Sequence, residues 1–232
     1  TGGISPQLEG EEMKVSDPGF DGGDRTSIQL PAVQTELMKA LKATGKPVIF
    51  VMMTGSAIAT PWESENIPAI LNAWYGGQSA GTAVADILFG DYNPSGRLPI
   101  TFYKSDSDLA SFNDYNMENR TYRYFKGEPQ YGFGFGLSYT TFKYSKLEMP
   151  VQAEKDKNVS VLITITNTGK FSGEEVVQLY VLNQGKKIKT AIKALKGFER
   201  VSLNPGQSKT ITFTLAPQDL SYVTAEGKLQ QL

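Results

Sequence analysis

Three carboxylates stand within four residues near the start of the chain, at Glu9, Glu11 and Glu12. They fall within residues 1–25, a stretch rich in Gly, Pro, Asp and Glu whose lack of any helical or strand period predicts a long loop. Like charges held this close raise the pKa of at least one carboxyl group. A carboxylic acid that stays protonated near neutral pH can serve as a general acid, although solvated acidic loops are also common on protein surfaces.

A metal site is a third interpretation of this acidic segment. A hard cation needs more oxygen ligands than the cluster provides, and Asp17, Asp21 and Asp24 follow at spacings that miss the calcium-loop pattern. The chain contains no His and no Cys, so imidazole and thiolate ligands from this chain are excluded. We therefore predict neither a metal nor another cofactor.

Residues 77–81 fit the G-x-S-x-G pattern of a hydrolase nucleophile, with Ser79 at the centre between a predicted strand and a predicted helix. Because the chain has no histidine, Ser79 has no imidazole to accept its proton, and a Ser-His-Asp triad is excluded. We interpret Gly77 and Gly81 as positions of close packing and Ser79 as the cap of the following helix.

A second glycine pattern consists of Gly132, Gly134 and Gly136. Its G-x-G-x-G spacing differs from the G-x-G-x-x-G dinucleotide fingerprint, and no helical pattern follows, so nucleotide binding is not predicted. Aromatic residues alternate with these glycines. We therefore expect backbone that packs closely against rings.

The overall composition is that of a folded protein with one large or two ordinary domains, since 40% of its 232 residues are apolar. The balance of 23 basic and 24 acidic residues gives no long-range attraction for nucleic acid or anionic lipid. No apolar run reaches the roughly 18 residues that span a bilayer. Neither a nucleic-acid partner nor a membrane partner is predicted. The chain begins with Thr rather than Met, which suggests a processed or excised piece.

Helical and strand patterns alternate in the first part of the chain. Val48–Met53 is an unbroken apolar run, typical of a strand that is buried on both faces. This alternation predicts parallel α/β layering. A sheet of two or three strands leaves apolar edges uncovered, so we expect upstream polypeptide, or a second copy of the chain, to cover them. The expected elements are a helix over Leu30–Gly45, the strand over Val48–Met53, a weak helix near Glu63–Pro68, a strand within Ala69–Trp74 and a helix over Ser79–Leu88.

From about residue 141 the pattern becomes that of β-strands. Alternating runs over Val159–Thr166, Glu175–Val181 and Lys209–Leu215 are separated by turns at distances typical of a β-sandwich. Residues 103–140 keep no period and are rich in Tyr and Phe, which indicates an extended connector held by aromatic anchors. The predicted organisation is a partial α/β domain over 1–103, a connector over 104–140 and an all-β immunoglobulin-like sandwich over 141–232.

Six motifs are spread over essentially the whole chain. They are Gly3–Glu12 with Gly23–Arg25, Trp74–Gln78, Leu88–Pro99, Arg120–Tyr124, Tyr131–Tyr139 and Leu195–Val201. In order and spacing they resemble glycoside hydrolase family 3, the β-glucosidases and β-xylosidases built from a barrel, an α/β sandwich domain and a fibronectin type III-like domain. The resemblance implies that this chain contains the C-terminal part of the sandwich domain and the fibronectin type III-like domain.

The resemblance also implies retaining hydrolysis of a terminal non-reducing β-linked glucose or xylose through a glycosyl-enzyme intermediate. In this family the nucleophile is an Asp on the barrel, which this chain lacks. The acid/base in this family is a Glu on a sandwich-domain loop. The match to the family pattern implies Glu11. Glu12 is the alternative if the alignment shifts by one residue, and Glu9 is a further alternative. The chain departs from that pattern because Glu12 stands where Gly is usual and extra residues precede Asp24 and Arg25.

A β-glycosidase fragment of this kind is expected to be inactive without the barrel and to belong to a periplasmic or secreted enzyme. Its expected partners are a β-glycoside or oligosaccharide substrate and the barrel, with a homodimer as a further assembly. The alternative is a noncatalytic carbohydrate-binding or scaffold fragment, in which aromatic residues between Tyr115 and Tyr139 stack on sugars. Core or interdomain packing is the commoner use of such rings. The β domain is expected to have a structural role only.

Overall fold

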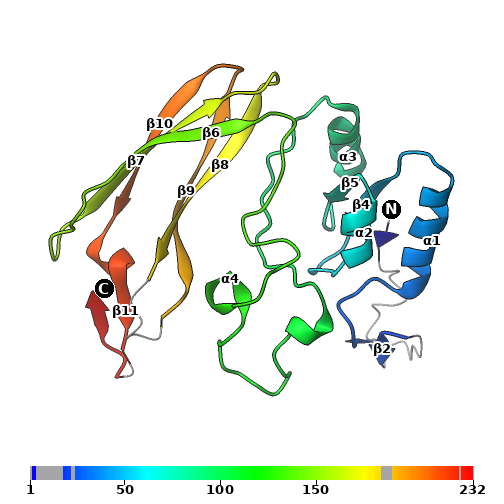
Figure 1. The fold of residues 1–232 in the computed structure, drawn as a ribbon, viewed down its shortest axis with the longest axis horizontal. Helices are drawn as coiled ribbons and strands as arrows, with labels where there is room; N and C mark the ends of the chain where they lie inside the picture. Colours follow the sequence, from blue (N-terminus) through cyan, green and yellow to red (C-terminus); the bar gives the residue numbers. More distant parts are fainter. Residues whose placement is uncertain (1, 4–17, 22–23, 184–189, 225, 232) are drawn as a thin grey trace. The chain divides into compact units, whose positions relative to one another are not determined.

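The computed structural model describes residues 2–3, 18–21, 24–183, 190–224 and 226–231. The chain divides into two compact units, each of which is described by itself (Figure 1). The first unit comprises residues 1–88, 99–120 and 126–133, and the second comprises residues 89–98, 121–125 and 134–232.

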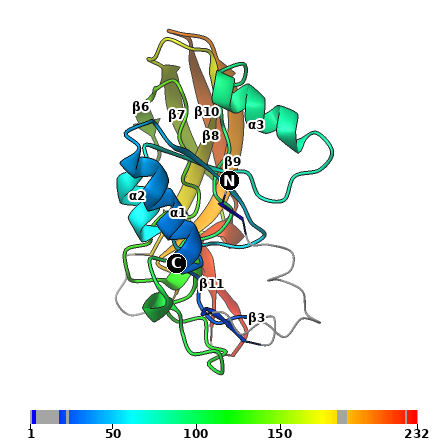
Figure 2. The ribbon, with the colours of Figure 1, turned by 90° about the vertical axis from the view of Figure 1, so that its right-hand side faces the viewer.

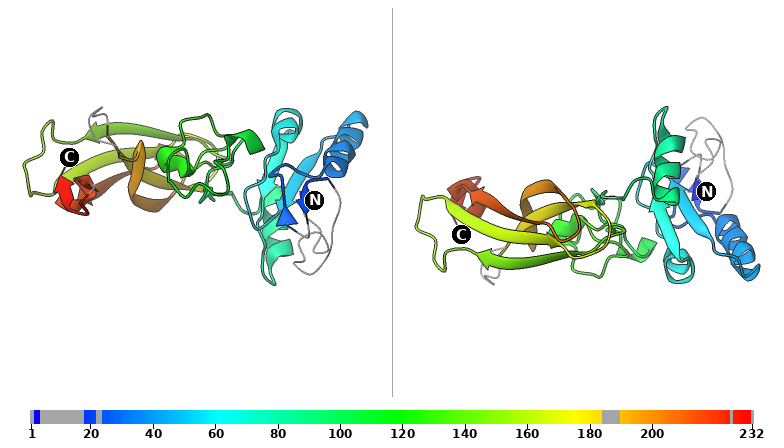
Figure 3. Two further views of the ribbon diagram at one scale, coloured as in Figure 1. Left: turned by 90° about the horizontal axis from the view of Figure 1, so that it is seen from below. Right: turned by 90° about the horizontal axis from the view of Figure 1, so that it is seen from above.

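A three-stranded parallel sheet forms the centre of the first unit. The unit's elements are β1 (Gly2–Gly3), β2 (Phe20–Asp21), β3 (Asp24–Arg25), α1 (Ala32–Ala43), β4 (Ile49–Met53), α2 (Pro61–Asn66), β5 (Ala69–Asn72) and α3 (Ala80–Phe89). The strand order is β1-β4-β5, and both pairings are parallel. The middle strand buries Phe50, Val51 and Met52. Helices α1 and α2 lie on one side of the sheet and α3 on the other (Figures 2 and 3), which confirms the predicted α/β layering.

Helix α1 begins and ends at signals that the sequence provides. Pro31 precedes it, where a missing N–H removes no helical hydrogen bond, and Gly45 follows with φ +75°, a left-handed conformation that glycine adopts without strain. Its apolar side chains are only partly covered within the described chain. Met38 is buried, whereas Val33 is 74% exposed and Leu37 is 58% exposed.

The prediction of one continuous loop over residues 1–25 is wrong in two places. Gly2 and Gly3 form β1 by pairing with Met52 and Met53, and β2 pairs with β3 as a short antiparallel hairpin. These strands depend on backbone hydrogen bonds to a neighbouring strand. Two glycines have no side chains that could alternate between faces, so strand periodicity cannot indicate them.

Two antiparallel sheets form the second unit, as the alternating runs predicted. Its strands are β6 (Phe142–Glu148), β7 (Val159–Asn167), β8 (Gly173–Leu182), β9 (Lys193–Leu203), β10 (Ser208–Leu215), β11 (Ser221–Val223) and β12 (Leu229–Gln231). The sheets have the orders β10-β7-β6 and β8-β9, and β11 pairs with β12. The strands of the two larger sheets run in roughly the same direction (Figures 1 and 3). Their shared core contains Ile165, Val177, Val201, Leu203 and Ile211, which is the packing of a β-sandwich.

Strand β9 is a long strand that side-chain periodicity did not predict. It pairs with β8 along its length, with an irregular register between Leu179 and Tyr180. Gly197 interrupts its pattern, and a Cβ at that position would lie 2.8 Å from a ring carbon of Phe213. The close approach explains the glycine, and tertiary pairing rather than local pattern forms this strand.

The aromatic-rich segment after residue 103 contains both buried and exposed rings. Phe102 is 1% exposed and packs edge to face against Trp74 and Tyr131, with ring centroids 6.1 Å and 6.2 Å away. Tyr131 is therefore an aromatic anchor, as predicted, whereas Phe112 and Tyr115 are 92% and 89% exposed. The short helices here and downstream are η1 (Asp106–Asp108), α4 (Thr121–Tyr124) and η2 (Pro217–Leu220). Among the described helices, none has the length and hydropathy needed to cross a bilayer.

Candidate active site

The predicted carboxylates Glu9, Glu11 and Glu12 lie outside the residues that the structure describes. The described strand before them, β1, ends at Gly3, which pairs with Met53, the last residue of β4. Because β1 and β4 are parallel, the chain leaves β1 at the carboxyl edge of the sheet. Open α/β sheets bind their ligands at this edge. Gly3, the last described residue before the acidic segment, therefore lies at the edge where a site is expected.

The hairpin of β2 and β3 follows the acidic segment in the sequence and is held by Arg25. Its Nε donates a hydrogen bond to the carbonyl oxygen of Ser27 at 3.0 Å, and its Nη2 donates to the carbonyl oxygen of Gln29. The guanidinium also lies 5.7 Å from the ring centroid of Phe20, which is buried. The Asp-Arg dipeptide that ends the predicted acid/base motif thus contributes an arginine that fixes local backbone.

A shallow hollow of about 350 Å³ lies where β4 and β5 end. Met53 and Ala73 line it from the strand ends, and Ala80 and Val84 line it from α3. No titratable side chain belongs to the described lining of this hollow. By itself it offers an apolar surface at the carboxyl edge and no acid–base chemistry.

Gly77, Ser79 and Ala80 of the G-x-S-x-G pattern line this hollow, but the two glycines of the pattern do not pack as we predicted. A Cβ at Gly77 or at Gly81 would meet no atom within 4 Å, so the close-packing interpretation is wrong for both. The close approach occurs earlier in the turn, at Gly76, where a Cβ would lie 2.4 Å from the Cβ of Ala80. Ser79 directly precedes α3, at the predicted cap position, and its carbonyl oxygen accepts a hydrogen bond of 3.0 Å from the backbone N–H of Ala83.

Backbone strain marks the same edge of the sheet. Trp74, two residues after β5, has φ +56°, a conformation that bulky L-residues rarely adopt. Its ring packs against Phe102. The ring of Tyr75 lies so close to Gly55 that a Cβ there would be 2.8 Å from a ring carbon. The Trp74–Tyr75 turn is therefore fixed by rings on one side and by the backbone after β4 on the other.

Two carboxylates are buried among the described residues, Glu63 and Glu175, and sequence reasoning identified neither as buried. The Thr35 hydroxyl donates a hydrogen bond of 2.6 Å to Glu63 Oε1. Thr35 belongs to α1 and Glu63 to α2, so this carboxylate connects two helices. Glu175 belongs to β8 in the second unit.

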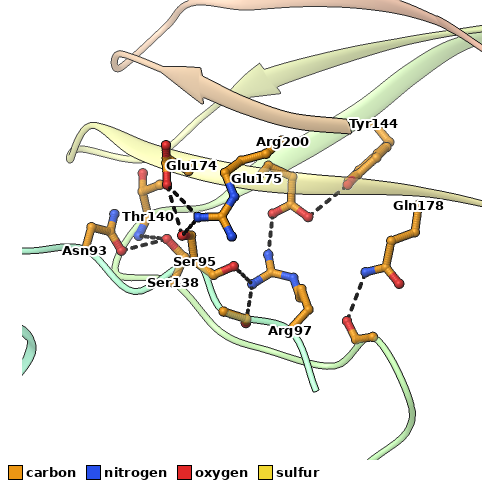
Figure 4. Close-up of polar contacts among 12 residues, drawn as sticks. Asn93, Ser95, Arg97, Ser138, Thr140, Tyr144, Glu174, Glu175, Gln178 and Arg200 are labelled. Carbon is orange, nitrogen blue, oxygen red and sulfur yellow. Dashed lines mark hydrogen bonds and ion pairs between the residues drawn. The ribbon is translucent and has the colours of Figure 1, made fainter. Parts of the chain in front are cut away.

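Glu175 forms a buried ion pair with Arg97 (Figure 4). Arg97 Nη2 lies 2.7 Å from Glu175 Oε2, and each side chain is 12% exposed. Arg97 Nη1 also donates to the carbonyl oxygen of Gly96 at 3.0 Å. The Tyr144 hydroxyl donates to Glu175 Oε1 at 3.0 Å. Burial, and then the negative charge of Glu175, raise the pKa of Tyr144, so its hydroxyl keeps the proton that it donates.

The adjacent carboxylate, Glu174, forms a second network (Figure 4). Its Oε2 accepts hydrogen bonds of 3.1 Å from the hydroxyls of Ser95 and Tyr92 and from Arg200 Nη1. Burial tends to raise the pKa of Glu174, but these hydrogen bonds and the charge of Arg200 outweigh it and lower the pKa. A carboxylate with a lowered pKa is a poor proton donor near neutral pH. The two networks therefore hold residues 92–97 against the β8–β9 sheet and do not form a catalytic pair.

The second glycine pattern packs against the same surface. Gly134 has φ +81°, and a Cβ there would lie 2.1 Å from Gln178 Oε1. Its carbonyl oxygen accepts a hydrogen bond of 3.0 Å from Gln178 Nε2 (Figure 4). A Cβ at Gly136 would lie 2.1 Å from the carbonyl oxygen of Gly96. Close approach is confirmed at Gly134 and Gly136, where the nearest atoms are an amide oxygen and a backbone oxygen rather than rings, but not at Gly132, where a Cβ would meet only Pro129 Cγ, at 4.0 Å.

Comparisons with known proteins account for these motifs. The model of the glycosyl hydrolase family 3 C-terminal domain matches residues 3–139, and that of a fibronectin type III-like domain matches residues 175–230. A xylan 1,4-beta-xylosidase from Xylanibacter ruminicola is 51% identical over 225 residues, which cover 97% of this chain and 26% of that protein. A periplasmic beta-glucosidase from Salmonella typhimurium is 40% identical over 221 residues, which cover 90% of this chain and 29% of that protein.

Solved structures show the same relationship. A beta-glucosidase from Kluyveromyces marxianus has a TM-score of 0.80 and 34% identity, over 90% of this chain and 26% of that one. A beta-glucosidase from Listeria innocua, in complex with isofagomine, has a TM-score of 0.79 and 31% identity, over 92% of this chain and 32% of that one. The chain thus spans about a quarter to a third of the length of these relatives. With its parallel α/β unit followed by a fibronectin type III-like sandwich, the chain belongs to glycoside hydrolase family 3 and corresponds to the C-terminal part of its members.

Proposed function

We propose that this chain supplies the general acid/base, Glu11, of a retaining β-glycosidase that removes terminal non-reducing β-linked glucose or xylose from oligosaccharides. The observation that carries this proposal is the family match over residues 3–139, which includes Glu11, in a chain whose relatives are named beta-xylosidase and beta-glucosidase. In such an enzyme one carboxylic acid protonates the leaving oxygen and later deprotonates water. The position of Gly3, which ends β1 at the carboxyl edge of the sheet, supports this role.

We assign the nucleophile to an Asp of the family's barrel domain, outside this chain. Retaining glycosidases hold their two carboxyl groups about 5–5.5 Å apart. The neighbouring carboxylates Glu174 and Glu175 cannot serve as that pair, because Arg200 and Arg97 already engage them. Under this proposal the barrel and a β-glycoside substrate are therefore the partners of this chain.

The surface of the first unit supports the presence of a further packing partner. Val33, Leu37 and Leu41 recur every four residues along α1, and all three are exposed in the described chain. Side chains at this spacing form one face of a helix. An apolar face of this kind is stabilised when other polypeptide covers it. Relatives that are three to four times longer contain polypeptide that could do so.

The isolated chain is expected to hydrolyse neither aryl β-glucosides nor aryl β-xylosides, because one carboxylate cannot complete a double displacement. Nitrophenol release by the purified 232-residue chain, compared with an enzyme that includes the barrel, measures this. Adding the barrel as a separate polypeptide is expected to restore activity. The same chain with Glu11→Gln is the matched control and is expected not to restore it with unactivated glycosides. Turnover by the isolated chain at the rate of the longer enzyme would refute the assignment.

A noncatalytic carbohydrate-binding fragment is the second candidate, and the exposed rings of Phe112 and Tyr115 favour it. Exposed aromatic rings can stack on sugars. Calorimetric titration of the isolated chain with neutral xylo- and gluco-oligosaccharides separates the two candidates. Binding that is lost in a Phe112→Ala, Tyr115→Ala variant supports the binding fragment, whereas absence of heat supports the catalytic one.

The location and the assembly also belong to this proposal. We place the enzyme in the periplasm or outside the cell, supported by a relative that is named a periplasmic beta-glucosidase.

A homodimer would cover the exposed face of α1, and light scattering of the isolated chain measures whether it forms. A strictly monomeric mass would rule the homodimer out.

A further inference from the structure

A polar pocket of about 260 Å³ lies within the second unit, between α4, β9 and the segment from η2 to β11. It is separate from the hollow at the edge of the parallel sheet, which belongs to the first unit. Its volume suits a group of the size of one sugar ring better than a drug-sized ligand. The lining side chains that could recognise a ligand are Arg123, Tyr124, Asn183, Lys196, Asp219 and Tyr222.

The backbone that carries Arg123 and Tyr124, in α4, is fixed by contacts with the sandwich. The backbone N–H of Ile192 donates to the carbonyl oxygen of Arg123 at 2.7 Å. The backbone N–H of Leu195 donates to the hydroxyl of Tyr122 at 3.2 Å, and the Tyr122 ring packs edge to face against another ring of the sandwich. The short helix is therefore fixed to β9. A backbone that is already fixed loses little freedom on binding.

Positive charge exceeds negative charge in this pocket. The Arg123 guanidinium lies 5.6 Å from the ring centroid of Tyr124, and among the described residues it has no hydrogen-bond or carboxylate partner. Lys196 Nζ lies 3.8 Å from Asp219 Oδ1, a long ion pair. The other oxygen of Asp219 accepts a hydrogen bond of 3.0 Å from the backbone N–H of Ala216. The guanidinium of Arg123 is thus available to bind an anion.

The other lining side chains can form hydrogen bonds with hydroxyl groups of a ligand and can contact its ring. The hydroxyls of Tyr124 and Tyr222 have no hydrogen-bond partner among the described residues. Asp219 can accept hydrogen bonds from hydroxyl groups, and its negative charge disfavours a dianion such as phosphate more than a monoanion. A guanidinium binds a carboxylate through two parallel hydrogen bonds. Aromatic side chains that have a polar tip combine apolar contact with hydrogen bonding.

We propose that this pocket binds the uronic acid residue of an acidic oligosaccharide. Arg123 binds the carboxylate, Asp219 and Lys196 bind ring hydroxyls, and Tyr124 and Tyr222 contact the sugar ring. This gives the second unit, in which Arg123 and Tyr124 join the fibronectin type III-like domain, a binding role beyond the structural one expected from the sequence for the β domain. The site does not involve Glu11 or the barrel. A test of this pocket is therefore independent of the proposed hydrolase function.

Titration of the full chain with D-glucuronic acid, D-glucose and acetate tests the proposal. We expect glucuronate to bind with a dissociation constant in the millimolar range, and glucose and acetate to bind at least about tenfold more weakly. Chemical shifts of the Arg123 and Tyr222 signals are expected to change with glucuronate. Arg123→Gln is expected to weaken glucuronate binding about tenfold or more, because it removes a charge-assisted pair.

Lys209→Gln is the matched control, since it removes one positive charge from an exposed pair on β10 in the same unit, outside the pocket lining. It is expected to leave glucuronate binding unchanged. Any of three results would overturn the proposal: equal affinity for glucose and glucuronate, equal affinity for acetate and glucuronate, or equal loss in the two variants. Absence of saturation up to about 50 mM glucuronate would also overturn it.

Discussion

Replacing Glu11 by Gln in the complete enzyme is expected to reduce kcat/KM for alkyl glycosides and oligosaccharides by about 10²- to 10⁴-fold, the usual contribution of general acid catalysis. Gln has nearly the size of Glu but cannot donate a carboxylic proton. Glycosides with good leaving groups, such as dinitrophenyl glycosides, depart without protonation. We expect their glycosylation step to be affected far less.

Glu12→Gln and Glu9→Gln are the matched controls, because each removes one negative charge from the same segment. Both are expected to retain most of the activity on both substrate types. The pH profile gives an independent readout, since loss of the acid removes the alkaline limb of kcat/KM. An equal loss on good and poor leaving groups would argue against proton donation by Glu11. If Glu12→Gln, and not Glu11→Gln, loses activity mainly on glycosides with poor leaving groups, the acid/base is Glu12.

Replacing Arg97 by Met is expected to destabilise the β-sandwich unit by about 3–5 kcal/mol, which is among the larger effects of a single substitution. The change leaves Glu175, whose side chain is 12% exposed, without its cationic partner. Tyr144 still donates one hydrogen bond to it, but a hydroxyl does not neutralise the charge. Urea unfolding of the full chain, followed by tyrosine fluorescence and circular dichroism, measures the loss.

Two further variants make this prediction specific. Lys209→Met breaks an exposed pair with Glu199, in which the side chains are 50% and 41% exposed, and is expected to cost no more than about 1 kcal/mol. The double variant Arg97→Met, Glu175→Met is expected to recover much of the lost stability, because it no longer buries an unpaired charge. If Arg97→Met and Lys209→Met cost the same, the buried pair does not hold residues 92–97 on the sandwich.

The sequence predicted those elements whose side chains repeat with a regular period. Helix α1, strand β4 and strands β7 and β10 lie where the apolar patterns place them, within a few residues. The strands bury a face or a run of their own side chains, and α1 carries an apolar face although most of it is exposed in the described chain, so a local pattern is sufficient to indicate each element. Strands β1 and β9 were not predicted, because Gly2–Gly3 has no side-chain pattern and Gly197 interrupts the other.

The sequence by itself also determined which kinds of chemistry the side chains of this chain exclude. The absence of histidine and cysteine excluded imidazole and thiolate catalysis by this chain, and the carboxylates Glu9, Glu11 and Glu12 remained as the predicted candidates. Only the tertiary structure decided that Arg97 pairs with Glu175, 78 residues away, and that Arg123 and Asp219 line one pocket. Residue type fixes which protons and charges are available, and it is local information. Which charges meet depends on how distant segments pack, and no local pattern contains that information.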